Sequence, residues 1–185
     1  YEQRLANEIC PLIRSHRFTL DLHSTHCVGD VPFAFCDYPD DYNRKVIEAL
    51  PVDYVLEGWP EIYGRQAQIQ DFSTEQCAHV YGNTATTLEC GYHKEPKAAE
   101  LAYRAIISAL AAFDMVDLSK PAAHEKTHIQ MKSFVLKTGE GKLCRNYKHL
   151  DPLVKGEKIA VYDGGEFLYA PEDGFILLPN LQAPV

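Results

Sequence analysis

Two short segments decide the fold: residues 18–25 read FTLDLHST and residues 84–91 read TATTLECG. Threonine and the large apolar residues favour β-strands, and each segment ends at an ionisable residue before a turn-forming cluster. Open α/β sheets bind their ligands at the carboxyl ends of such strands. The first strand offers His23 there and the second offers Glu89. A histidine ligand and a carboxylate base are two groups that a metal-dependent hydrolase needs.

The composition indicates a soluble globular protein. The chain has 185 residues, of which 46% are hydrophobic and 24% are charged, so it can bury a sizeable core. The formal net charge of -8 argues against a nucleic-acid partner, which favours a basic surface. No apolar run approaches the roughly 20 residues of a membrane span. The six cysteines are scattered without a C-x-x-C pair, which favours reduced thiols and a cytoplasmic location.

Strands and helices alternate over the first two thirds of the chain. The pattern predicts a helix over 2–15 that Pro11 bends or interrupts, a helix capped by Asp41, and a strand over 52–56. Residues 59–71 are expected to be irregular. Ser73 begins a capping-box pattern, a strand follows at 84–90, and Pro96 suits the first turn of a long helix.

The pattern changes after Pro121, where short alternating segments are separated by glycine turns. We therefore expect two domains, an α/β domain at 1–118 and a small all-β domain at 125–185. The α/β domain should contain a mixed, mostly parallel sheet covered by helices. The segment 167–176, FLYAPEDGFI, resembles the strand turn of lipoyl-like domains, so the β domain is expected to be lipoyl- or barrel-sandwich-like.

His23 and Asp21 point to the same face of a strand, because side chains alternate with a period of two. A carboxylate two residues from a histidine can accept a hydrogen bond from a metal-binding imidazole and so orient it without touching the metal. The imidazole would be that of His23 or of a neighbouring ligand. The alternative is a hydrogen-bonded core histidine beside an aspartate that closes the strand. Glu89 suits proton transfer if it is partly buried, but it could equally pair with a basic side chain.

The Asp-Leu-His-Ser-Thr strand, the Thr-Thr-Leu-Glu-Cys-Gly strand and the glycine-rich β tail together resemble the succinylglutamate desuccinylase/aspartoacylase family. This family is a branch of the zinc carboxypeptidase-like hydrolases. The resemblance covers nearly the whole chain. It implies that His23 is one ligand of a single Zn2+ and that Glu89 is the general base. The substrate class that it implies is a small N-acyl amino acid, whose amide bond is hydrolysed.

The sequence departs from the family pattern in the other two zinc ligands, which the family takes from an upstream His-x-x-Glu motif. None of the eight histidines here is followed three residues later by glutamate. Only 22 residues precede His23, which are too few for the missing strand, motif and crossover helix. We therefore expect an N-terminally incomplete zinc-hydrolase domain, inactive alone, with weak zinc binding through His23.

Two other functions stay open at this stage. One is a zinc carboxypeptidase-like peptidase, and the other is a non-catalytic binding or scaffold protein that lacks the His-x-x-Glu motif. The substrate-binding residues are unknown. Arg65 in the polar loop offers a guanidinium that can pair with a substrate carboxylate, but a solvated loop residue is the better explanation. The sequence is compatible with a homo-oligomer and does not identify the acyl group.

Overall fold

The structure is a computed structural model that describes residues 2–63, 73–117 and 125–179. It divides the chain into two compact units, Tyr1–His26 with Pro32–Ser133, and Cys27–Val31 with Phe134–Val185. The described helices of the first unit are α1 (Glu2–Ser15), α2 (Asp41–Ala49), α3 (Trp59–Tyr63), α4 (Thr74–Val80) and α5 (Pro96–Ala112). Its strands are β1 (Phe18–Thr25), β2 (Phe33–Phe35), β3 (Tyr54–Glu57), β4 (Thr84–Tyr92) and β5 (Thr127–Gln130).

These strands form one sheet in the order β1-β4-β2-β3-β5. The pairs β1–β4, β2–β3 and β3–β5 are parallel, and β2–β4 is antiparallel. The sheet is therefore mixed and mostly parallel, as predicted. Since β1 and β4 run in the same direction, their carboxyl ends meet at one edge.

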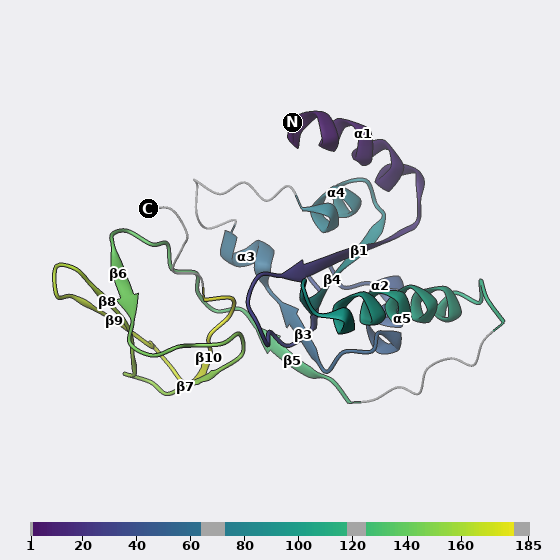
Figure 1. Cartoon of the computed structure of the whole chain (residues 1–185). Coiled ribbons are helices and arrows are strands. Elements are labelled where there is room, and N and C mark those ends of the chain that lie inside the picture. The colour runs from purple at the N-terminus through teal and green to yellow at the C-terminus, as the bar shows by residue number, and fades with distance from the viewer. Residues whose placement is uncertain (1, 64–72, 118–124, 180–185) are drawn as a thin grey trace. The chain divides into compact units, whose positions relative to one another are not determined.

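Helices cover both faces of this sheet. Figure 1 shows α1 and α4 on one side of β1 and β4, with α2 and α5 on the other. The larger core lies on the α2 and α5 side, and a smaller cluster lies under α1 and α4. The larger core includes the fully buried side chains of Val46, Leu50, Val55 and Leu88. Leu20 and Leu22 of β1 pack against the same core, which leaves the alternate residues of β1 on the α4 side.

Local capping explains where the helices begin. The Ser73 side chain accepts a hydrogen bond from the Gln76 amide at 3.1 Å, so the predicted cap of α4 is confirmed. Pro96 occupies the first turn of α5, where no backbone donor is needed. The cap of α2 is Asp40 rather than the predicted Asp41, because the Asp40 carboxylate accepts from the Asn43 amide at 2.8 Å.

Other local features differ from the expectations. The strand β2 was not predicted, because its three residues are too few to show a period of their own. Trp59–Tyr63 forms the helix α3 instead of an irregular segment. Helix α1 continues through Pro11, so of the two predicted effects the interruption does not occur, and a bend at Pro11 stays a prediction. The rest of the predicted irregular segment, residues 64–72 with Arg65, lies outside the described residues.

The division between the units also differs from the predicted ranges of 1–118 and 125–185. Thr127–Gln130 pairs with β3 in parallel, with Tyr54 opposite Thr127 and Glu57 opposite Gln130. This segment therefore belongs to the α/β sheet, and the second unit resumes only at Phe134. Parallel pairing between strands this far apart in sequence leaves no local signal.

The second unit contains two small antiparallel sheets. One has the order β6 (Gly141–Leu143), β8 (Lys158–Tyr162) and β9 (Phe167–Tyr169). The other pairs β7 (Pro152–Leu153) with β10 (Gly174–Phe175). Its core is built around Tyr147, Ile159 and Ala170. The all-β character predicted for this part of the chain holds for its described residues, while the lipoyl-like assignment stays a prediction.

Within the part of the chain that the structure describes, none of the helices has the length and apolar character needed to cross a membrane.

Candidate active site

The parallel register of β1 and β4 brings the two predicted site residues together. Asp21 lies opposite Thr87, and His23 lies opposite Glu89. The Nδ1 atom of His23 is 3.8 Å from Oε1 of Glu89. The ladder then shifts register between His23 and Thr25, at the end where the strands leave the sheet. The structure therefore places an imidazole and a carboxylate side by side at one carboxyl edge.

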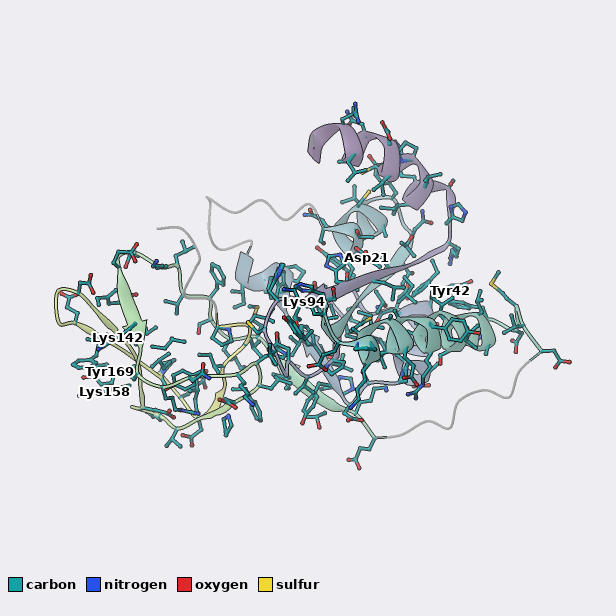
Figure 2. All side chains as sticks on the ribbon, viewed as in Figure 1. Asp21, Tyr42, Lys94, Lys142, Lys158 and Tyr169 are labelled. Carbon is teal, nitrogen blue, oxygen red and sulfur yellow. The ribbon has the colours of Figure 1, made fainter. Side chains whose placement is uncertain are left out.

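The side chains concerned share the face of the sheet that α4 covers. Ala85 of β4 packs with Ala78 of α4, so the alternate residues Thr87 and Glu89 lie on the same face. On β1, Asp21 contacts α4 directly, because the Thr74 hydroxyl donates to Asp21 Oδ2 at 2.6 Å. Figure 2 labels Asp21 on β1, below the short helix α4.

Asp21 contacts the His23 ring, with Oδ1 at 3.3 Å from Nε2. Burial raises the pKa of Asp21, but the hydrogen bonds from His23 and Thr74 and the charge of a protonated His23 outweigh it, and the pKa lies below its ordinary value. The hydrogen bond to Asp21 raises the pKa of His23. Partial burial lowers this pKa, and the negative charges of Asp21 and Glu89 raise it further. Asp21 therefore holds one ring nitrogen, and the other faces Glu89.

The two partners differ in exposure. The His23 side chain is 52% exposed, whereas that of Glu89 is 14% exposed. An exposed imidazole can reach a ligand in solution, and a nearly buried carboxylate beside it is shielded from water. Their roles as metal ligand and general base, and the orienting role of Asp21, stay predictions.

Glu75 is a residue of this region that the sequence did not reveal. It lies in the first turn of α4, only 2% exposed, and accepts hydrogen bonds from the amides of Thr87 at 2.7 Å and Asp37 at 3.3 Å. Burial raises the pKa of Glu75 to about 7, although both backbone hydrogen bonds oppose the shift. The capping-box pattern located this glutamate on α4, but its burial depends on segments far away in sequence.

Two further histidines follow the ends of these strands. His93 places Nδ1 at 2.8 Å from the Thr25 carbonyl oxygen, and its ring meets the edge of the His26 ring with centroids 5.0 Å apart. If that nitrogen carries the proton and donates to the carbonyl, Nε2 of His93 keeps its lone pair. Neither histidine belongs to the predicted site, because His93 has no companion at metal-ligand spacing in the sequence and His26 is interpreted from the sequence as a loop residue of a kind that usually does not bind metal.

The described residues do not build a zinc site by themselves. No group of three or more histidine, cysteine, aspartate or glutamate side chains is arranged to hold a metal ion within residues 2–63, 73–117 and 125–179. A catalytic zinc needs three protein ligands. His23 suits one ligand position because its side chain is about half exposed and the Asp21 carboxylate lies at one of its ring nitrogens.

A separate hollow of about 420 Å³ also lies in the first unit. Neither His23 nor Glu89 lines it. Its lining includes His128 and Glu57, whose Nδ1 and Oε1 atoms are 2.6 Å apart. Since it contains none of the predicted residues, the strand edge with its facing imidazole and carboxylate remains the candidate site.

The sequence matches no protein-family model, and no curated protein matches it significantly. Solved structures are similar. A succinylglutamate desuccinylase from Vibrio parahaemolyticus aligns with a TM-score of 0.71 at 15% identity, covering 98% of this chain and 57% of that one. The enzyme of the same name from Vibrio cholerae gives 0.68 at 19% identity, covering 97% and 56%. A succinylglutamate desuccinylase/aspartoacylase from Rhodobacter sphaeroides gives 0.66 at 14% identity, covering 95% and 57%.

The chain has the succinylglutamate desuccinylase/aspartoacylase fold. The family resemblance predicted from the sequence is confirmed at this level. The chain spans just over half the length of these solved structures, at 56% and 57%. A comparison of site residues with these structures is therefore limited to the part of the fold that this chain contains.

Proposed function

We propose that this chain carries part of the active site of a zinc-dependent hydrolase that cleaves the amide bond of small N-acyl amino acids. In this proposal His23 is one zinc ligand, Asp21 orients its ring and Glu89 is the general base. The observation that carries the proposal is the register pairing of His23 with Glu89, on a fold shared with desuccinylases.

Asp21 and Thr74 give His23 a defined orientation. The Thr74 hydroxyl holds one carboxylate oxygen of Asp21, and the other oxygen lies at Nε2 of His23. A carboxylate that accepts one ring N–H leaves the lone pair on the other nitrogen, which is the form that binds a metal. Bound zinc would supply a Lewis acid that polarises the substrate carbonyl and makes water more acidic.

In the same proposal, Glu89 transfers a proton during the reaction. The carboxylate would accept a proton from the water that attacks the amide carbonyl, forming a tetrahedral adduct. It would then give the same proton to the leaving nitrogen as the carbon–nitrogen bond breaks, so that the products are a carboxylic acid and a free amine. The same group thus serves as base and then as acid, which is typical of amide hydrolysis.

Because the chain spans about half of the related structures, the activity is proposed for the whole protein, with two more zinc ligands supplied from outside the described residues. Cytoplasmic location and the N-acyl amino acid substrate belong to the same proposal.

A panel of N-succinyl and N-acetyl amino acids, assayed beside dipeptides with zinc present, tests this function in the whole protein. We expect turnover of at least one acyl amino acid, and its loss on chelation followed by recovery when zinc is returned. Preferential cleavage of dipeptides would instead indicate the peptidase alternative. Absence of any turnover in protein that has bound zinc would contradict the proposal.

A non-catalytic homologue is the second candidate, and it is favoured by one observation. The described residues hold no three-ligand metal cluster. Zinc titration separates the two functions, because a hydrolase needs about one tightly bound zinc per active site, whereas a binding protein that kept only the fold does not.

A further inference from the structure

Two cysteine thiols from different helices meet in the first unit. Sγ of Cys77 on α4 lies 3.3 Å from Sγ of Cys10 on α1, at hydrogen-bonding distance for sulfur. Both side chains are partly buried and both are free thiols. They are separated by 67 residues in sequence, so the tertiary packing of α1 on α4 produces this contact.

We propose that Cys10 and Cys77 are a redox-active pair that forms a reversible disulfide joining α1 to α4. Disulfide formation requires side chains whose β-carbons already lie close together. Two sulfur atoms at 3.3 Å need only a small further approach, which rotation about the Cα–Cβ bonds can supply.

The bond would reinforce a helix that has few other attachments. Among the described side chains of α1, only Ile13 is buried, and Leu5, Ile9 and Leu12 are 42%, 41% and 61% exposed. Its other anchors include the Asn83 side chain, which donates to the Ile13 and Arg14 carbonyl oxygens. A covalent link to α4 would therefore restrict the motion of α1 more than the existing contacts do.

The bond would also restrain the helix that contacts the candidate site. Cys77 lies on the same short helix as Thr74, whose hydroxyl holds Asp21. The first turn of that helix also carries Glu75, which holds the Thr87 amide of β4. The redox state of the pair would thus set how firmly α4 rests against β1 and β4.

The oxidant we assign is a small-molecule disulfide such as oxidised glutathione. The Cys10 thiolate attacks one sulfur of the oxidant and releases one glutathione thiolate, which gives a mixed disulfide. The Cys77 thiolate then attacks the Cys10 sulfur and releases the second glutathione. The two cysteines lose two electrons to the oxidant, and their two protons end on the two glutathione thiols.

The first attack is assigned to Cys10 because of the surroundings of Cys77. Burial and the hydrogen bond with Cys10 raise the pKa of Cys77 to about 11, while Arg14 lowers it. Little of the Cys77 side chain is therefore thiolate at neutral pH, which suits it to the second, intramolecular attack. Once Cys10 carries the mixed disulfide, its sulfur is already in contact, and the second step is intramolecular.

Peptide mapping tests the proposal directly. The reduced protein is equilibrated in glutathione buffers from fully reduced to fully oxidised, quenched by alkylation and digested with trypsin without reductant. We expect a linked species that joins the Cys10 peptide, residues 5–14, to the Cys77 peptide, residues 66–94, with fragmentation placing the bond on Cys77 rather than Cys90. Added dithiol should reverse it.

Matched variants complete the experiment. Cys77→Ser should lose the linked species, and a double variant, Cys27→Ser with Cys144→Ser, should keep it, because those two thiols are exposed. The oxidised wild type should melt about 5 °C or more above the reduced form, and Cys77→Ser should show no such shift.

The proposal is overturned if Cys10 and Cys77 are recovered only as free thiols or separate glutathione adducts in the fully oxidised buffer. It is also overturned if the linked species forms without any rise in melting temperature, since the bond would then not tether α1 in the native fold. Neither readout depends on hydrolase activity, so the result is independent of the proposed function.

Discussion

His23 and Glu89 are register partners in the parallel pair β1–β4, with Nδ1 of the imidazole 3.8 Å from Oε1 of the carboxylate. Parallel strands place their carboxyl ends at the same edge, so two residues 66 positions apart in the numbering become neighbours. Asp21 lies at the other ring nitrogen of His23, and the Thr74 hydroxyl donates a hydrogen bond to Asp21. The candidate site is thus a chain of contacts that runs from α4 through β1 to β4.

Replacing His23 by alanine should remove a zinc ligand. We expect the zinc affinity of the whole protein to fall by more than about 100-fold, because loss of a ligand should cost more than loss of a group that only orients one. Zinc content after dialysis against dilute zinc measures the effect. His16→Ala is the control, since His16 is exposed at the end of α1 and should leave zinc binding unchanged. Equal zinc content in both variants would remove His23 from the metal site.

Thr74→Val should loosen the orientation of the His23 ring indirectly, because Thr74 acts on that ring only through Asp21. The variant keeps the shape of the side chain but loses the 2.6 Å hydrogen bond to Asp21. We expect zinc affinity or turnover to fall by about tenfold, which is the lower end of the loss seen when a group that orients a metal ligand is removed. Thr74→Ser keeps the hydroxyl and should restore most of the loss. If the serine and valine variants behave alike, the hydroxyl does not act through Asp21.

The predictions from sequence succeeded where the signal was local. The FTLDLHST and TATTLECG segments formed β1 and β4, Ser73 capped α4, and Pro96 began α5. Each of these depends on alternation or on a cap within a few residues. These local signals located both strands and their carboxyl ends, while the register that sets His23 opposite Glu89 comes from the parallel pairing of β1 with β4.

The failures concern non-local packing. From the sequence, β5 was assigned to the β domain, because the sequence of residues 127–130 does not indicate parallel pairing with residues 54–57. The burial of Glu75 and the contact between Cys10 and Cys77 likewise depend on how α4 meets β4 and α1. Such contacts arise only when the whole fold has formed, so local patterns could not reveal them.

Glu75 should make stability depend on pH. Burial raises its pKa from 4.5 to about 7, so the folded state keeps a proton that the unfolded chain releases between these pH values. The stabilising contribution of the neutral carboxyl is therefore full below about pH 4.5 and is lost as the pH rises through 7. With about 1.4 kcal/mol for each pKa unit, the loss amounts to roughly 3 kcal/mol.

Urea unfolding of the wild type and of Glu75→Gln at pH 5 and pH 8 measures this effect. The wild type should lose more stability than the variant over this interval. The glutamine side chain cannot ionise, although it offers one acceptor oxygen in place of the two that receive the backbone hydrogen bonds. Glu100→Gln on the exposed surface of α5 is the control and should follow the wild type. Parallel pH profiles for Glu75→Gln and the wild type would show that Glu75 does not titrate in this range.

Turnover by Glu89→Gln in the whole protein, measured together with its zinc content, tests the central claim most directly. The account predicts that zinc stays bound while kcat falls by about 100-fold or more, because the amide cannot accept the proton of the attacking water. Glu100→Gln should retain full activity. Zinc-loaded Glu89→Gln that keeps more than about a tenth of wild-type turnover would contradict the assignment of Glu89 as the general base.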